Sequence, residues 1–398
     1  MKVAVVTNFY PPSAEGGAEI FARDLNDELG RRGFTVEVFT TSHGKARIVQ
    51  QGNVLVRYFK APPLPRLVSD VFGYNFNPWA RGLVKALSKS SYDILHVHNI
   101  NSTVMLHPLL AGIRRPIVCH VHDHWPVCYR GVLFVTWRNE PCVAARPSCC
   151  FNPGRRTIGR VNLAFRRKLL ALFENQVSAF VVPTRHMESA LVSRGFTTPD
   201  KIRHIRLGLN FEQVPVHQVT RADSFVFAGR LVGYKNPQLL IELARRRGIP
   251  RAVKFVILGK GPLESTLRRD AAELEARVIV LGGRPREVVL AQMRRARGVL
   301  VPSYVPENSP LVVIESLATG TPVLCSSVGG AKELIEESGG GRTVSANDAV
   351  LWEAAIMSLL DTDEFERISR RAAAFAKNEL AINRCGDSVA KLYDSLVA

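Results

Sequence analysis

The chain has no long apolar run. Its longest stretch without a charged residue, 94–113, contains three histidines and two asparagines, which would be costly in the hydrocarbon of a bilayer. After Met1 and Lys2 only four apolar residues follow, too few for the core of an export signal. We therefore expect no transmembrane helix and a cytoplasmic protein.

The chain also lacks a cysteine framework and any internal repeat. It has seven cysteines, an odd number, and no C-x-x-C pair, so we expect reduced thiols or metal ligands rather than disulfides. No solenoid-length repeat and no low-complexity tract is present. With 46% hydrophobic and 22% charged residues, the composition excludes a disordered or collagen-like chain.

Acidic residues are too few to balance the basic ones. The chain has 53 Lys and Arg residues but only 35 Asp and Glu residues, which gives a net charge of +18. Residues 1–199 account for +13 of this charge. Such a field favours nucleic acid, an anionic membrane or a phosphate-bearing substrate. Nucleic acid is the weakest of the three, because the basic residues are not interleaved with a stacking aromatic platform or a recognition motif.

A length of 398 residues indicates two domains. Short β-branched runs alternate with turns and helical patterns in both halves, which predicts an α/β protein with two Rossmann-like domains, each built on a parallel sheet, facing a cleft. The expected strands are Lys2–Asn8, Thr35–Thr41, Asp93–Asn99, Pro116–His122, Ala179–Thr184, Ser224–Arg230, Lys254–Lys260, Arg277–Gly283, Gly298–Ser303 and Pro322–Ser327.

The polar, weakly periodic stretch Leu209–Asp223 is the expected boundary between the domains. It gives an N-terminal domain of residues 1–210 and a C-terminal domain of residues 211–380. Residues 381–398 follow the completed second sheet with helical periodicity. We expect that helix to dock near the domain junction.

The run from Pro306 to Glu315 predicts an anion site. Asn308 or Ser309 would cap a helix with Pro310 in its first turn, so that Glu307 precedes the helix and Glu315 lies inside it. The free amides at the helix start, which include Ser309, Leu311 and Val312, suit a diphosphate, with a carboxylate reaching toward each end of a nucleotide-sugar. The alternative is that the carboxylate of Glu307 only interacts favourably with the positive N-terminal end of the helix, and that Glu315 is a solvent-exposed residue of that helix.

Further candidates follow the strands of the second domain. Arg230 and Lys235 come just past its first strand, where ligands bind in open α/β sheets, and two cations there would neutralise a leaving diphosphate. The turns with Gly259 and Gly261, and with Arg284, end later strands and permit close backbone approach to a ligand. The alternatives are surface charges and turns that serve packing only.

The first domain offers glycines and histidines. Gly16 and Gly17 open a helix after the first strand and would either admit phosphate or only shape the turn. His96 and His98 share one face of a strand; a zinc pair is possible there, but core histidines are favoured without a third ligand nearby. His122, at the next strand end, is either a polar contact to substrate or a hydrogen-bonded loop histidine.

Together these residues resemble the retaining glycosyltransferases of GT-B fold, specifically glycosyltransferase family 4, over nearly the whole chain. The resemblance implies Glu307 at the donor sugar, Glu315 at the ribose and His122 near the anomeric centre. It implies no metal requirement, because Arg230 and Lys235 would take the diphosphate. The motifs that carry it are Gly16-Gly17-Ala18-Glu19, Gly229-Arg230-Leu231 with Lys235, Gly259-Lys260-Gly261-Pro262, and the pair Glu307 and Glu315. Asn308-Ser309-Pro310 departs from the Phe-Gly pair that often follows the first glutamate.

The segment from His122 to Lys168 is the most individual part of the chain. Cys128, Cys142, Cys149 and Cys150 could hold a structural zinc, although adjacent Cys149 and Cys150 are poorly spaced for one. Val161–Phe173 mixes apolar and basic residues, which fits either a basic helix on an anionic membrane or a core helix with a charged outer face.

We therefore expect a hexosyltransferase that moves a sugar from a UDP- or GDP-sugar to a glycan or a lipid-linked, phosphate-bearing acceptor. A peripheral location at the inner face of the membrane is an alternative to a wholly cytoplasmic one. The alternatives are a nucleotide-sugar epimerase of the same fold and a non-catalytic protein that binds a nucleotide-sugar or nucleic acid. An epimerase would need the donor alone.

Overall fold

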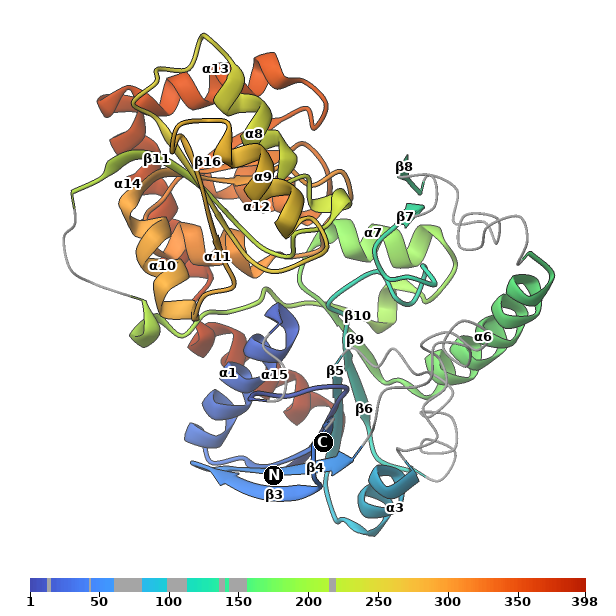
Figure 1. The fold of residues 1–398 in the computed structure, drawn as a ribbon. Coiled ribbons are helices and arrows are strands. Elements are labelled where there is room, and N and C mark those ends of the chain that lie inside the picture. Colours follow the sequence, from blue (N-terminus) through green and yellow to red (C-terminus); the bar gives the residue numbers. More distant parts are fainter. Residues whose placement is uncertain are drawn as a thin grey trace. The chain divides into compact units, whose positions relative to one another are not determined.

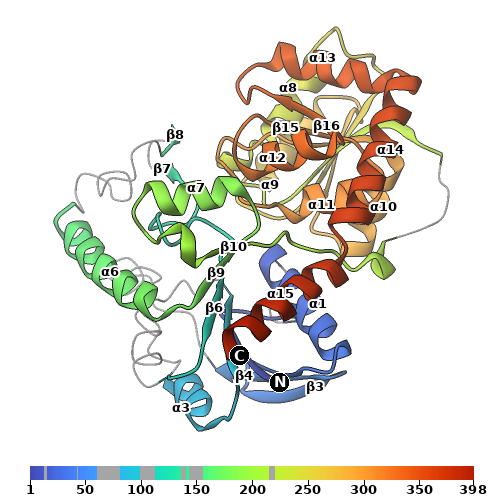
Figure 2. The same cartoon turned by 180° about the vertical axis from the view of Figure 1, so that it is seen from behind.

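The computed structural model describes residues 1–12, 16–42, 44–60, 81–98, 113–135, 140–142, 156–214 and 220–398. The chain forms two compact units, each with its own sheet. Unit 1 contains 1–133, 142–208 and 382–398; unit 2 contains 134–141 and 209–381. The prediction of an α/β protein with two Rossmann-like sheets is confirmed. Figures 1 and 2 show the elements of both units from opposite sides.

The sheet of unit 1 has eight strands in the order β10-β9-β6-β5-β1-β2-β4-β3. All neighbours are parallel except β3 and β4, which form an antiparallel pair at one edge. Its central strands are buried throughout, as expected for a sheet covered on both faces. The strands are β1 (Lys2–Thr7), β2 (Thr35–Ser42), β3 (Arg47–Gln51), β4 (Val54–Lys60), β5 (Ile94–His98), β6 (Ile117–His120), β9 (Ala179–Val182) and β10 (Ile202–His204).

The C-terminal helix belongs to unit 1 and packs against its first helix, side by side in Figure 2. The guanidinium of Arg32, just past the first helix, donates to Asn383 O at 2.8 Å and pairs with Asp387. Both chain ends therefore lie in the same unit. The helices of unit 1 are α1 (Gly17–Arg31), α3 (Arg81–Lys89), α6 (Arg156–Gln176), α7 (Arg185–Ser193), the 3₁₀ turn η4 (Pro199–Lys201) and α15 (Ile382–Val397).

The sheet of unit 2 has six parallel strands in the order β13-β12-β11-β14-β15-β16, with α8, α9, α12 and α13 labelled around it in Figure 1. Its strands are β11 (Ala222–Ala228), β12 (Lys254–Leu258), β13 (Val278–Gly282), β14 (Ala296–Val301), β15 (Val323–Ser326) and β16 (Gly341–Val344). A separate ribbon, β7 (Phe134–Val135) with β8 (Glu140–Pro141), also clusters with unit 2.

The helices of unit 2 follow its strands in the βαβ rhythm that the sequence predicts. Leu209, where the chain enters this unit, pairs with Ala381, where the chain leaves it. The helical segments are η5 (Phe211–Gln213), η6 (Gly233–Lys235), α8 (Gln238–Arg245), α9 (Glu264–Ala272), α10 (Arg286–Arg295), α11 (Leu311–Ala318), α12 (Gly329–Ser338), α13 (Ala349–Leu360) and α14 (Thr362–Glu379).

Candidate functional site

Loops at the carboxyl ends of β11 and β14 bring two of the expected site residues together. The ammonium group of Lys235, in η6, donates to the carboxylate of Glu307. The hydroxyl of Ser303, two residues past the buried end of β14, donates to the same carboxylate. Glu307 is therefore held by two donors from two loops, and Ser303 is a contact that the sequence analysis did not single out.

The backbone of Glu307 is fixed as well. The amide of Gly330, in the first turn of α12, donates to Glu307 O at 2.7 Å. Gly329 has a φ of +71°, and a Cβ on it would lie 2.6 Å from that same oxygen. Only glycine fits there without displacing the loop, so the start of α12 sets the position of Glu307.

Arg230 lies beside an aromatic pair. Its Nη2 donates to the hydroxyl of Tyr234 at 2.5 Å, and the centroid of the Tyr234 ring lies 5.7 Å from that of Phe134. The amide of Tyr304 donates to Tyr234 O at 2.9 Å, which ties the loop after β11 to the loop that carries Glu307. Tyr234 therefore orients Arg230, a role that no sequence pattern indicated.

Gly259 and Gly261 pack against the loop that carries Arg230. A Cβ on Gly259 would lie 1.8 Å from Gly229 O, and one on Gly261 would lie 2.4 Å from Leu231 O. The amide of Leu231 donates to Lys260 O at 2.9 Å. The close approach that these glycines allow in the structure is thus between two backbone segments, and its effect is to place Arg230.

The start of α11 differs from the predicted cap. Pro310, with a φ of −70° and a ψ of 124°, occupies the N-cap position itself, and the helix begins at Leu311 with no side-chain cap. Asn308 is buried one turn earlier, and Ser309, Leu311 and Val312 are half-buried. Proline has no side-chain acceptor, so no side chain at the N-cap position binds the first amides of α11. The prediction that Asn308 or Ser309 caps the helix is therefore wrong.

Glu315 lies inside α11 and is 8% exposed. Nε of Arg286 donates to its Oε1 at 2.7 Å, and Nη1 of Arg286 donates to Gln213 Oε1 at 2.6 Å. The alternative of a solvated Glu315 is therefore wrong. Arg284, which the sequence analysis had chosen, is exposed. Arg286, two residues on and at the start of α10, is the residue that pairs with Glu315.

The N-terminal glycines lie at the start of α1. Gly16 is the N-cap residue, Gly17 begins the helix, and a Cβ on Gly16 would lie 2.3 Å from a carboxylate oxygen of Glu19. The residues just before them, 13–15, lie outside the described residues. The glycines therefore allow Glu19 to fold back over the helix start.

Four histidines form a cluster on one face of the sheet of unit 1. His96 and His98 come from β5, His120 from β6, and His122 follows β6; Nδ1 of His98 lies 3.0 Å from Nε2 of His122. Core histidines were expected because the sequence shows no third ligand nearby; in the structure His120 supplies one, with ligand atoms of all three histidines within 4.8 Å of one another. Burial lowers the pKa of His122 and of His96 to about 3, so both are neutral at pH 7.

The predicted cysteine zinc site gains no support. Cys128 and Cys142 are buried, and neither belongs to a metal-binding group among the residues that the structure describes. Cys149 and Cys150 lie outside the described residues.

Helix α6 exposes an apolar stripe beside basic residues. Val161 is 66% and Phe165 54% exposed, while Arg166, next to Phe165 in the sequence, is buried and donates to Trp125 O at 2.5 Å. Exposed basic residues flank the stripe: Arg160, Arg167 and Lys168. Within the described part of the chain, no helix is both long and apolar enough to cross a membrane.

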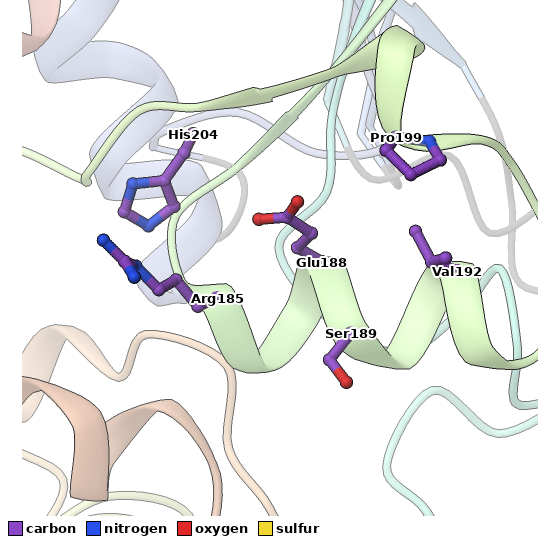
Figure 3. A pocket seen from close by; sticks show the side chains of 6 residues that line it. All are labelled: Arg185, Glu188, Ser189, Val192, Pro199 and His204. Atoms are coloured by element: carbon purple, nitrogen blue, oxygen red, sulfur yellow. The ribbon is translucent and has the colours of Figure 1, made fainter.

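A separate pocket of about 470 Å³ opens in unit 1 and contains none of the expected site residues. Figure 3 shows Arg185, Glu188, Ser189 and Val192 along α7, with His204 and Pro199 on the segment that faces this helix. Arg185 and His204 give one end a basic character, and Val192 with Pro199 makes the other end apolar.

Two family models match the chain, one after the other. The model "Glycosyltransferase Family 4" matches residues 15–213, and the model "Glycosyl transferases group 1" matches residues 213–377. A D-inositol 3-phosphate glycosyltransferase of Nocardia farcinica is 36% identical over 94% of this chain and 85% of its own length. The enzyme of the same name from Corynebacterium efficiens is 28% identical over 95% of this chain and 92% of its own.

Solved structures of similar fold cover the chain from end to end. Sucrose-phosphate synthase from Thermosynechococcus elongatus has a TM-score of 0.77 at 19% identity, covering 99% of this chain and 98% of its own. HepE of Anabaena in complex with UDP-glucose has a TM-score of 0.73 at 20% identity and covers 100% of both chains. These likenesses concern the fold.

Proposed function

Because the chain belongs to glycosyltransferase family 4 and has the GT-B fold, we propose that it is a retaining glycosyltransferase that uses a UDP- or GDP-sugar. The acceptor we propose is a glycan or a lipid-linked, phosphate-bearing molecule. The observation that carries the donor assignment is the convergence of Lys235, Ser303 and Glu307 at the carboxyl edge of the sheet of unit 2.

Lys235 and Arg230 are the proposed diphosphate ligands. A glycosyl transfer leaves a nucleoside diphosphate, whose growing negative charge needs preorganised cations. The ammonium group of Lys235 is held beside Glu307, and the guanidinium of Arg230 is oriented by Tyr234, so both cations are in place before the bond breaks. Arg230 and Lys235 could in this way balance the negative charge of the diphosphate, which other transferases balance with a divalent metal ion.

Glu307 is the proposed contact to the donor sugar. A carboxylate accepts hydrogen bonds from sugar hydroxyls. Ser303 and the amide of Gly330 fix its side chain and backbone from two sides. Donor binding would then turn the ammonium group of Lys235 from the carboxylate to a phosphate oxygen and leave Glu307 for the sugar. Departure and attack on the same face through an oxocarbenium-like state would retain the anomeric configuration.

Glu315 is the proposed contact to the ribose. Nε of Arg286 donates to one of its oxygens at 2.7 Å, which gives the buried carboxylate a partner and fixes its direction. The glycines Gly259 and Gly261 act indirectly, by placing the Arg230 loop. The amides of Ser309, Leu311 and Val312, around the uncapped start of α11, are the proposed neutral donors to phosphate.

His122 of unit 1 is proposed for the anomeric centre on the family resemblance. The histidine is neutral at pH 7 and its Nε2 lies 3.0 Å from Nδ1 of His98, so it would act there as a hydrogen-bonding group rather than as a cation. The amides of Gly16 and Gly17, at the N-terminus of α1, are proposed as donors to the ligand from the same unit.

The proposed acceptor class rests on charge and on the relatives. Residues 1–199 carry most of the +18 net charge, and the curated relatives at 28% and 36% identity are named for an inositol phosphate acceptor. A phosphate on the acceptor would be attracted by this field. The basic, partly apolar face of α6 is consistent with an acceptor presented at an anionic membrane.

The experiment compares D-inositol 3-phosphate with unphosphorylated inositol, using the donor that binds. We expect a glycosylated product from the phosphorylated acceptor only, with the donor's anomeric configuration retained in its NMR spectrum. An isomerised nucleotide-sugar formed without any acceptor would instead identify an epimerase. Equal rates with both acceptors would contradict phosphate recognition.

A further inference from the structure

The buried imidazoles of His96, His98 and His120 converge at a point that no proposed substrate contact uses. They come from the neighbouring parallel strands β5 and β6, on which His98 and His120 are paired in register. Each side chain is at most 1% exposed. One ring nitrogen of each lies within 4.8 Å of one ring nitrogen of the other two.

Most ring nitrogens of this cluster are buried without a partner. Among the described residues, Nε2 of His96, Nε2 of His98 and both nitrogens of His120 have no hydrogen bond. A buried polar nitrogen that makes no hydrogen bond is costly, and three such rings on one sheet face would be a poor choice for a purely apolar core. The arrangement calls for an occupant that binds several nitrogens at once.

The remaining nitrogens have the partners that metal-ligating histidines require. Nδ1 of His96 lies 2.5 Å from the hydroxyl of Tyr393, on α15, and Nδ1 of His98 lies 3.0 Å from Nε2 of His122. If each Nδ1 carries the hydrogen and donates it to these acceptors, each Nε2 presents a lone pair. Metal-binding histidines are oriented in this manner by a second partner on the other ring nitrogen.

We propose that His96, His98 and His120 bind one first-row divalent metal ion that stabilises unit 1. Three imidazoles without a carboxylate select zinc, cobalt, nickel or copper over magnesium and calcium, which prefer oxygen. The site is distinct from the diphosphate contacts proposed in unit 2, and its role is structural: it joins β5 to β6 and, through Tyr393, to α15.

The geometry requires only side-chain motion. Zinc–nitrogen bonds of about 2.1 Å at tetrahedral angles separate the ligand atoms by roughly 3.4 Å. The rings are now near parallel, at 15° between His96 and His120 and 19° between His98 and His120, with centroids 5.7 and 5.3 Å apart. Rotation about the Cβ–Cγ bonds, which have broad torsional wells, would turn the three lone pairs toward one point.

Metal content and cobalt titration test the site. Purified tag-free protein, stripped with chelator and dialysed, is titrated with Co²⁺ and Zn²⁺ while folding is followed by circular dichroism. We expect one equivalent of Co²⁺ with the d–d absorption of an imidazole-ligated ion, displaced by Zn²⁺, and a higher unfolding temperature with metal. A wild-type protein that binds neither ion tightly would overturn the proposal, since ordered water would then be the occupant.

Two variants and a control separate this site from adventitious binding. His120→Asn should abolish the cobalt spectrum. Tyr393→Phe, which keeps the ring and removes the acceptor for His96, should weaken binding about 10- to 100-fold. His204→Gln changes an exposed histidine of the same unit and should bind as the wild type does. If His120→Asn does not fold, Tyr393→Phe decides, and wild-type affinity in it would contradict the site.

Discussion

The ammonium group of Lys235 pairs with the carboxylate of Glu307, 72 positions along the chain, across the loops that follow β11 and β14. The side chains are only 20% and 12% exposed, so the pair is shielded from solvent and held in one orientation. In the absence of a donor the cation is neutralised by its neighbour. A diphosphate is the partner that would draw Lys235 away and free Glu307 for the sugar.

Lys235→Ala should lower kcat about 10²- to 10³-fold, because it removes one preorganised cation from the leaving diphosphate. Steady-state release of nucleotide in the presence of acceptor measures the effect. Lys332→Ala is the matched control, since Lys332 is a lysine of the same unit whose side chain is 44% exposed and pairs with Glu336. Equal losses in both variants would point to a general charge effect and contradict the assignment.

Glu307→Gln should keep the fold and lose transfer, since an amide keeps the shape of the carboxylate but loses the charge that faces Lys235. We expect kcat to fall at least about 100-fold while the unfolding temperature stays near that of the wild type. Wild-type transfer in this variant would exclude Glu307 from the reaction.

Arg286→Ala should destabilise unit 2 by about 3 kcal/mol, because it leaves the carboxylate of Glu315 buried without its partner at 2.7 Å. Urea unfolding followed by tryptophan fluorescence measures the change. The double variant Arg286→Met with Glu315→Gln should recover most of the loss, since it removes the buried charge. Equal instability of the single and double variants would mean that packing rather than charge is responsible.

Gly259→Ala should both destabilise the protein and impair transfer. Its φ of +139° disfavours any side chain, and the new Cβ would meet Gly229 O at 1.8 Å, so the loop with Arg230 must move. Gly52→Ala is the control, because Gly52 has a φ of +55° with open space around its Cβ position. We expect about 1 kcal/mol of strain and full activity in the control. Full activity in Gly259→Ala would show that the loop tolerates the shift.

Acidification should destabilise unit 1 through His124, which is 2% exposed. Burial, with smaller contributions from His186 and Arg194, lowers its pKa to about 3 from an ordinary 6.5. Between these values the unfolded chain binds a proton that the folded chain does not, so stability falls as pH falls, by up to about 1.4 kcal/mol per pH unit. His124→Gln should show a smaller difference between urea midpoints at pH 7 and pH 5 than the wild type.

Helix α6 should bind anionic vesicles through its exposed stripe. Sedimentation with vesicles of phosphatidylglycerol and phosphatidylcholine should retain the wild-type protein more than Phe165→Ser, because Phe165 is 54% exposed beside basic residues. Vesicles of phosphatidylcholine alone should bind weakly. Equal binding of the wild type and Phe165→Ser to both kinds of vesicle would contradict a specific role of α6 in membrane binding.

Most strands that are buried on both faces could be predicted from the sequence, whereas most of the strands at the edges of the two sheets could not. All ten expected strands exist, because continuous β-branched runs such as Val3–Val6 have few alternative structures. The antiparallel pair of β3, at the edge of its sheet, and β4 beside it was missed, since the partly exposed positions of both strands carry polar residues that are typical of loops as well. Strand β16 was missed because it has only four residues and begins with Gly341 and Arg342, which are not typical of strands.

Charged pairs were predicted less well than single residues. Glu307 and Lys235 were chosen separately, and their contact depends on how two loops meet. Arg284 was preferred to Arg286 because it directly follows the turn Gly282-Gly283, although α10 begins at Arg286, whose guanidinium contacts Glu315. Likewise, His120 could be joined to His96 and His98 only once β5 and β6 were known to be neighbours.

A donor-binding screen decides whether unit 2 holds a nucleotide-sugar. Purified protein, with no metal added, is screened by calorimetry against UDP-, GDP- and ADP-sugars, and release of free nucleotide is followed for each. We expect that one UDP- or GDP-sugar binds tightly and is slowly hydrolysed by the wild type, and that Lys235→Ala loses both. Binding of none of these donors would contradict this expectation.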